Sequence, residues 1–247
     1  MSTQPKGTRS SRIGCWSAAI GFLLIAISAG HKLGFLDSWQ LAFGALGLGG
    51  LAMFVALITS GIGLLRSRGT AGAASRPATW LAFVAALAIT GFNVRSMGGF
   101  RAPPMHDITT DTVNPPMFVA VIPVREAAHA ANPPMYFAAE NAARQLAAYP
   151  DITTIVMQAP ADQVFAKAEA TAKDMGWEIV ASVPAEGRIE ATATTGWIGF
   201  KDDVVIRIVN AGAETHVDLR SKSRVGRGDA GMNANRIRAF RDRITAS

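Results

Sequence analysis

Hydrophobic residues are distributed unevenly along the 247-residue chain. Three long runs without a charged residue fill most of the first hundred positions, at 13–30, 40–65 and 77–94. Each run, with its flanks, is long enough to cross about 30 Å of hydrocarbon as a helix. Polar and apolar positions alternate with short periods in the last hundred residues, as in ordinary strands and helices. The pattern therefore predicts a three-helix transmembrane region, residues 13–95, followed by a folded domain at residues 151–247.

The basic residues beside these runs gather before the first run and between the second and the third: Lys6, Arg9, Arg12, Arg66, Arg68 and Arg76. Cytoplasmic segments next to membrane helices are enriched in Lys and Arg. The basic tail, residues 1–12, is therefore predicted to be cytoplasmic. His31 and Lys32 follow the first run in place of a small-residue cleavage site, so this run is predicted to remain a span. Three crossings place the C-terminal domain in the periplasm of a bacterial inner-membrane protein.

Residues 96–150 contain three Pro-Pro-Met triplets, and two of them belong to longer repeats that read Asn-Pro-Pro-Met-aromatic, at 114–118 and 132–136. Paired prolines favour extended backbone and disfavour helix at the residue before them. This segment is predicted to be a Pro-rich extended arm that packs on the C-terminal domain. A short strand is expected at 118–124 and a helix at 138–148.

Residues 151–247 have the periodicity of an α+β domain. The expected strands are 152–158, 177–183, 188–194, 204–209 and 216–222, and the expected helices are 160–175 and 229–244. Consecutive strands joined by short turns indicate an antiparallel sheet with both helices on one face. We expect a helix-grip-like domain. A ferredoxin-like domain is the alternative, although it requires a helix between the middle strands, where none is predicted.

The stretch 218–240 carries the candidate binding residues. It is predicted to run from a strand through a glycine-broken loop into a helix, and the free N–H groups at a helix start attract anions. The candidate residues for an anion site are Arg220, Ser221, Ser223, Arg224 and Arg227. The ligand would be a phosphate, a lipid head group or a sugar acid. The competing interpretation is that these arginines pair with nearby carboxylates and hold the loop in place.

Six further polar residues are predicted to form a structural network: Asp202, Asp203, Arg207, Asp218, Asp229 and Asn233. The acidic pair at 202–203 is consistent with acid–base chemistry or a metal, but cross-strand ion pairing is the simpler interpretation. Asp229 suits the start of the last helix, and Asn233 is expected to satisfy backbone groups of the loop. No nucleophile motif accompanies His216, so no catalytic residue is assigned.

Composition narrows the function further. The formal charge of +6 comes from the membrane half, because acidic and basic residues balance after residue 150, so no nucleic-acid partner is expected. The only cysteine, Cys15, lies in the first apolar run, which leaves the domain without a thiol site. His106, Asp107 and Asp111 match no standard metal-ligand spacing. Neither a metal nor another cofactor is expected.

Three segments resemble a bacterial domain-of-unknown-function family, number fourteen ninety-nine. They are HDITTDT at 106–112, GWIGFKDDVVIRI at 196–208 and DLRSKSRVGRGDAGMNANRI at 218–237. The similarity extends from about His106 to the C-terminus, and members of the family often carry a short membrane region ahead of the domain. The resemblance implies the same organisation here and an important last loop, and it implies no activity.

These features predict a non-enzymatic inner-membrane protein, embedded in the lipid bilayer, whose periplasmic domain binds another envelope component. That partner would be a protein, an anionic lipid head group or another anionic ligand. The alternative is a membrane-anchored hydrolase or transferase that acts on an envelope substrate. A surface cleft that holds Asp203, Asp218 and His216 together would favour the enzyme. The same carboxylates buried in arginine pairs would favour the binding module.

Overall fold

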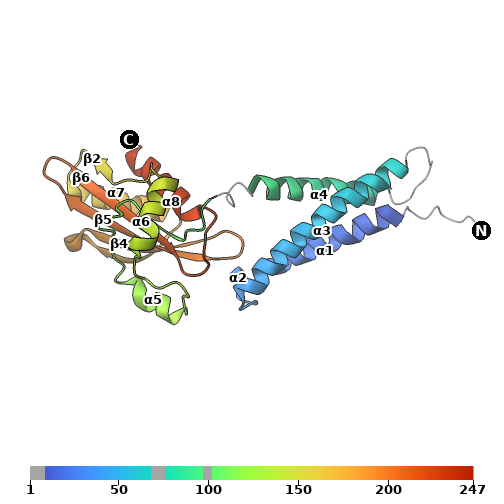
Figure 1. Cartoon of the computed structure of the whole chain (residues 1–247), viewed down its shortest axis with the longest axis horizontal. Helices are drawn as coiled ribbons and strands as arrows, with labels where there is room; N and C mark the ends of the chain where they lie inside the picture. The colour runs from blue at the N-terminus through green and yellow to red at the C-terminus, as the bar shows by residue number, and fades with distance from the viewer. Residues whose placement is uncertain (1–8, 68–75, 97–101, 247) are drawn as a thin grey trace, which may run out of the picture. The chain divides into compact units, whose positions relative to one another are not determined.

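The computed structural model describes residues 9–67, 76–96 and 102–246 (Figure 1). The chain divides into two compact units. One contains the three apolar helices, and the other comprises residues 99–195 and 200–247. Most of the predicted basic tail lies outside the described residues, as do Arg68 and the first part of the predicted arm, up to residue 101.

The three apolar runs form helices, as predicted. Helix α1 spans Arg9–Ser28, α3 spans Trp39–Arg66 and α4 spans Arg76–Ser96, with a single-turn helix α2 at Gly30–Leu33. All three long helices have the length and composition needed to cross a membrane. Ser38 caps α3, because its hydroxyl accepts a hydrogen bond from the backbone N–H of Leu41 at 3.3 Å.

Small residues allow the backbones of α1 and α3 to pack closely. A Cβ atom added to Gly14 would lie 2.8 Å from the backbone nitrogen of Ser60, and one added to Gly63 would lie 2.8 Å from that of Ser11. Membrane helices associate through such close packing because lipid tails are as apolar as the side chains. The contact between α1 and α3 therefore depends on positions with no side chain or a very small one.

The second unit is built on a six-stranded sheet. Its strands are β1 (Asp107–Thr109), β2 (Ile155–Met157), β3 (Glu178–Val183), β4 (Arg188–Thr194), β5 (Lys201–Asn210) and β6 (Thr215–Ser223). Strands β3 to β6 follow one another as neighbours, and β6 also pairs with both β1 and β2. Every pairing is antiparallel. The predicted antiparallel α+β domain is confirmed, and β6 pairs with three strands, β1, β2 and β5.

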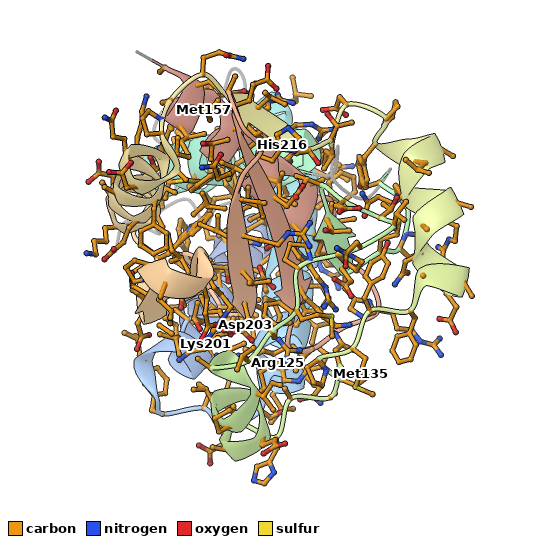
Figure 2. All side chains as sticks on the ribbon, turned by 90° about the vertical axis from the view of Figure 1, so that its left-hand side faces the viewer. Arg125, Met135, Met157, Lys201, Asp203 and His216 are labelled. Carbon is orange, nitrogen blue, oxygen red and sulfur yellow. The ribbon has the colours of Figure 1, made fainter. Side chains whose placement is uncertain are left out.

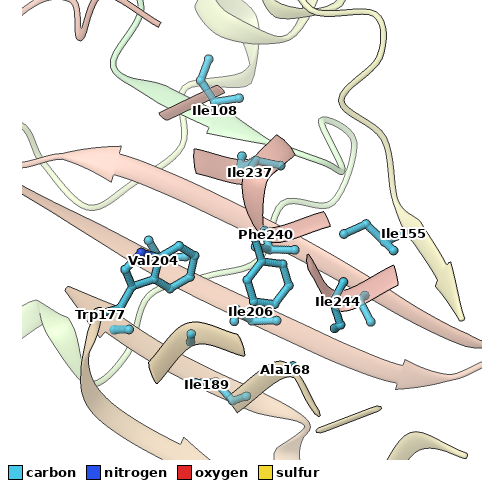
Figure 3. Close-up of a cluster of buried hydrophobic side chains, with 14 of the residues drawn as sticks. Ile108, Ile155, Ala168, Trp177, Ile189, Val204, Ile206, Ile237, Phe240 and Ile244 are labelled. Carbon is cyan, nitrogen blue, oxygen red and sulfur yellow. The ribbon is translucent and has the colours of Figure 1, made fainter. Parts of the chain in front are cut away.

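Two helices cover one face of this sheet and enclose the main core. They are α7 (Ala161–Asp174) and α8 (Met232–Thr245), and both contribute to one cluster of buried apolar side chains with β4, β5 and β6. Phe240 of α8 lies near the centre, where its ring stacks on Trp177 at a centroid distance of 5.6 Å (Figure 3). This face of the sheet is apolar because alternate residues of each strand point toward the helices.

The other face of the sheet meets the Pro-rich segment. This segment contains α5 (Val121–Ala127) and α6 (Ala138–Ala148), and its first strand, β1, belongs to the same sheet as β6. Phe118 and Val121 pack on Val205 of β5 in a second, smaller apolar cluster. Strands β4, β5 and β6 are therefore buried on both faces over most of their length, by helices on one side and by the Pro-rich segment on the other.

The helix predicted at 138–148 is confirmed as α6, whereas the strand predicted at 118–124 is wrong. The backbone N–H groups of Val119, Ala120 and Val121 all donate to the buried carboxylate of Glu190 on β4, at 2.9–3.0 Å. A carboxylate at this position satisfies the first N–H groups of a helix and interacts favourably with its dipole. Glu190 lies 70 positions after Ala120 in the chain. Its carboxylate thus stabilises the start of α5 in a stretch whose residues are typical of strands.

We expect Gly63→Ala to lower the melting temperature of the purified full chain in detergent. The added methyl group would meet backbone atoms of Ser11, so α1 and α3 must separate, and such overpacking costs about 1–3 kcal/mol. Gly44→Ala in the same helix is the matched control, since no atom lies within 4 Å of its added Cβ. Equal melting temperatures for the two variants would show that α1 and α3 do not meet at Gly63.

Candidate functional site

The two neighbouring acids of β5 point to opposite faces of the sheet. Asp202 lies on the helix side and accepts a hydrogen bond from Arg236 of α8 at 2.6 Å. Asp203 lies on the other side, where Arg224 donates to both of its oxygens, at 2.7 and 2.9 Å, and Arg125 of α5 donates at 2.5 Å. Because adjacent residues of a strand alternate between faces, these two carboxylates do not act as a pair.

A layer of buried charge lies between the sheet and the Pro-rich segment. Asp107 of β1 and Asp203 of β5 lie directly opposite Lys222 of β6 in the strand register. Arg220 binds Asp107 with two parallel hydrogen bonds of 2.8 Å, and Lys222 donates to the same carboxylate at 2.8 Å. The side chains of Arg220, Lys222 and Asp107 are at most 1% exposed. We refer to Asp107, Arg125, Asp203, Arg220, Lys222 and Arg224 as the charged layer.

Backbone carbonyls of the Pro-rich segment complete this layer. Asn132 accepts from Arg125, Pro134 accepts from Arg220, and Met135 accepts from Lys222, at 2.8–2.9 Å. An extended Pro-Pro backbone makes no internal hydrogen bonds, so its carbonyl groups are free to receive cations. The carbonyl group of Asn114, in the first repeat, accepts from Arg207 at 2.8 Å in the same way.

The aromatic residues of the two repeats lie on the arginines. The guanidinium carbon of Arg220 is 4.9 Å from the ring centre of Phe118 and 5.3 Å from that of Tyr136. Aromatic rings attract cations through their electron-rich faces, most strongly where water is excluded. Each Asn-Pro-Pro-Met-aromatic repeat therefore supplies a carbonyl acceptor and an aromatic ring to the basic residues of the sheet.

A second group of charges lies farther along the same face. Arg207 of β5 donates to Asp218 at 2.7 Å and to Asp111 at 2.9 Å. Burial alone raises the pKa of Asp111, but the N–H groups of Asn114 and Val113 and the guanidinium of Arg207 outweigh it and lower the pKa overall. The ion pair between Arg207 and Asp111 holds the first repeat against the sheet.

On the helix side, a separate polar network joins the end of β6 to the start of α8. The side-chain amide of Asn233 accepts from the hydroxyl of Ser221 at 2.6 Å and donates to that of Ser223 at 3.0 Å. The carboxylate of Asp229 accepts from the N–H groups of Gly231 and Asn233, at 2.8 and 2.6 Å. Burial raises the pKa of Asp229 despite these two hydrogen bonds. Asp229 thus satisfies N–H groups of the first helical turn, although Gly231 occupies the N-cap position.

The five residues predicted as an anion site do not line one surface. Ser221 and Ser223 belong to the helix-side network, whereas Arg220 and Arg224 belong to the charged layer on the opposite face. Arg227 is exposed in the loop before α8. The separation follows from strand alternation. The six residues of the predicted polar network all make side-chain hydrogen bonds, but they too are divided between the two faces.

Three members of the charged layer, Asp107, Arg125 and Lys222, were not predicted as site residues. Asp107 was considered only as part of a weak metal motif, and nothing in the sequence around Arg125 distinguishes it. The repeated Asn-Pro-Pro-Met-aromatic motif was the available signal, since it marks carbonyl groups and rings that require cationic partners. Those partners are distant in sequence, so the motif alone does not identify them.

The residues considered for catalysis are not gathered together. Asp203 and Asp218 are buried in arginine pairs, whereas the side chain of His216 is 42% exposed and lies 3.8 Å from Glu214 of the same hairpin. His216 and Met157 lie toward the opposite end of the sheet from Asp203 and Arg125 (Figure 2). Among the described residues, no group of three or more His, Cys, Asp or Glu side chains is arranged to hold a metal ion.

One comparison with known proteins gives a match. The model of a family described as "Protein of unknown function (DUF1499)" matches residues 107–244, which is more than half of the chain. The curated proteins and the solved structures contain no match. The matched region begins at the first residue of β1 and ends within α8, so it contains every strand of the sheet.

We expect Arg220→Ala to destabilise the second unit severely. The substitution leaves Asp107 with Lys222 alone and removes the cation between Phe118 and Tyr136, and breaking a buried ion pair costs about 3–5 kcal/mol. Arg227→Ala, in the exposed loop that follows β6, is the control and should leave the melting temperature of the full chain unchanged. A small loss for Arg220→Ala, similar to that of the control, would contradict a structural role for the charged layer.

Proposed function

The chain belongs to the family described as "Protein of unknown function (DUF1499)", and we propose that it is a multi-pass protein of a bacterial inner membrane whose periplasmic domain binds another envelope component. The three apolar helices make it a membrane protein by length and composition. The proposed periplasmic location rests on the basic residues beside the first two spans.

The observation that carries the binding role is the burial of the domain's carboxylates in arginine pairs. Asp202, Asp203 and Asp218 are 3%, 0% and 5% exposed, and each accepts hydrogen bonds from at least one arginine. A carboxylate held in this way is a poor general base, because its lone pairs are occupied and protonation would break the pair. The side chain of His216 is 42% exposed, and Glu214 is the charged partner that it has among the described residues. A binding module is therefore favoured over a hydrolase or transferase.

The same burial favours a protein partner over an anionic lipid. The lipid hypothesis requires Arg220 and Arg224 to reach a head group, but both side chains are at most 7% exposed beneath the Pro-rich segment. A head group would have to displace that segment with its aromatic and carbonyl contacts. Recognition of a protein by the exposed surface requires no such opening.

We also propose a helix-grip-like fold for the domain. Strands β3 to β6 form an uninterrupted antiparallel meander, and α7 and α8 lie on one face of it. A ferredoxin-like fold requires a helix between its middle strands. The connection between β3 and β4 is a 3-10 turn, Pro184–Glu186, followed by Gly187, and β4 and β5 are joined by a six-residue loop, 195–200.

Reporter fusions test the proposed orientation. A reporter that is active only outside the cytoplasm should be active when fused after Ser247 and inactive when fused after Leu65. Green fluorescent protein should show the reverse pattern, because it folds in the cytoplasm. Cytoplasmic activity of the fusion after Ser247 would refute the periplasmic assignment.

Photocrosslinking of the full chain in native membranes tests the binding role. A photoreactive residue at the exposed positions Met135 and Met232 should give an adduct with a defined protein, and the same residue at the buried position Val204 should not. Adducts with lipid alone would favour the anionic-lipid hypothesis instead. No adduct at any exposed position of the domain would count against a binding module.

A further inference from the structure

Helix α1 has two faces of different chemistry. One face packs on α3 through the small residues Ser11, Gly14 and Gly21. The other face carries an open hollow of about 380 Å³, and ligand sites in proteins are typically roughly 300–1,000 Å³. Its lining residues recur every three or four positions and so form one stripe along the helix. They are Arg9, Arg12, Ile13, Trp16, Ser17 and Ile20.

The two arginines form the polar end of this hollow. Arg9 and Arg12 are exposed, and within the part of the chain that the structure describes neither guanidinium has an ion-pair or hydrogen-bond partner. Trp16 is 69% exposed, and its indole N–H has no acceptor there either. Two cations and a neutral donor therefore stand together beside an apolar surface, free to bind an anionic group.

The sequence supplies no carboxylate that would offset these arginines. Asp37 is the only Asp or Glu in the first 106 residues, and it follows α2, at the opposite end of α1. Arg66, at the end of α3, donates to the hydroxyl of Ser10 at 3.4 Å and so adds positive charge near the hollow. Three crossings leave the carboxylates of the second unit on the other side of the membrane. The counter-charge must therefore come from the lipid or from solution.

The order of polar and apolar groups along the hollow matches a phospholipid. Arg12 directly precedes the apolar run 13–30, so the arginines lie at the level of the head groups. A helix rises about 1.5 Å per residue, which places Ile20 roughly 16 Å from Arg9, at the depth of the acyl chains. Trp16 lies between them, and Trp is enriched at this boundary. A free phosphate would contact the arginines and leave the apolar part of the hollow unused.

We propose that this hollow binds one anionic phospholipid. Arg9 and Arg12 hold its phosphate group, because guanidinium groups form strong charge-assisted hydrogen bonds with phosphate. One acyl chain lies along the apolar part of the stripe, which is formed by Ile13, Trp16 and Ile20. The site requires only that the three helices lie in a bilayer. It is separate from the partner proposed for the second unit, and it does not depend on the side of the membrane on which that unit lies.

Native mass spectrometry of the full chain in detergent tests this site. Dioleoylphosphatidylglycerol is compared with dioleoylphosphatidylcholine, which has the same acyl chains but no net charge. We expect one phosphatidylglycerol to bind roughly ten-fold or more tightly than phosphatidylcholine. An arginine near an anionic lipid contributes about five-fold in affinity, so Arg9→Gln combined with Arg12→Gln should weaken phosphatidylglycerol binding roughly thirty-fold. Sodium phosphate should not displace the lipid.

A matched double variant, Arg66→Gln combined with Arg76→Gln, separates a site from general surface charge. It removes two positive charges from the same side of the membrane region but from outside the hollow, so it should leave phosphatidylglycerol affinity nearly unchanged. The proposal is overturned if the two lipids bind equally tightly or if this control loses as much affinity as the variant of Arg9 and Arg12. Displacement of the lipid by sodium phosphate would overturn it as well, in favour of a free anion.

Photocrosslinking gives a second readout on the unaltered chain. A phosphatidylglycerol with a photoreactive acyl chain should form adducts within residues 9–20, and adducts that map only to other residues would refute the site. Neither experiment probes the second unit. The crosslinking test at Met135 and Met232 therefore succeeds or fails independently of this lipid site.

Discussion

The pairing of Asp107 with Arg220 and Lys222 is the interaction on which the architecture of the domain depends. It joins β1, the first strand of the matched region, to β6, which also pairs with β2 and β5. Ion pairs at this depth hold their geometry only where every remaining donor and acceptor is satisfied. The Pro-rich segment meets much of that requirement, because its carbonyl groups and rings reach the same cations.

This dependence explains why the Pro-rich segment behaves as part of the folded unit and not as a linker. Proline has no N–H group and fixes an extended backbone, so consecutive prolines present carbonyl groups that no local structure uses. Pro134 and Met135 direct such groups at Arg220 and Lys222. Tyr136, next in the chain, covers Arg220. The carbonyl groups and the aromatic ring of the repeat thus complement the basic side chains of β6. A flexible tether makes no such specific contacts.

The same burial limits what the domain does. The carboxylates best suited to acid–base catalysis are Asp203 and Asp218. Both are buried in ion pairs with arginine and stabilise the fold. The two serines nearest the last helix donate to or accept from Asn233, which fixes the loop before α8. What remains accessible is the outer surface of the domain. The proposed role in recognition rests on this distribution, because binding requires a stable surface and no freed acid or base.

The sequence by itself determined the parts that depend on local pattern. Uncharged runs specified three apolar helices, period-2 alternation specified the strands from β3 to β6, and helical periodicity specified α6 and α7. The motif at 218–237 specified the family. Only the tertiary structure decided on which face of the sheet each polar residue lies and with which partner it pairs. It placed the partners of Asp202 and Asp203 on opposite faces of the sheet. It placed Glu190 at the start of α5. It also paired Asp107 with Arg220 and Arg125 with Asp203, which are distant in the chain. Periodicity reports which side of its own element a residue faces, but the partner on that side is set by long-range packing, which no local window contains.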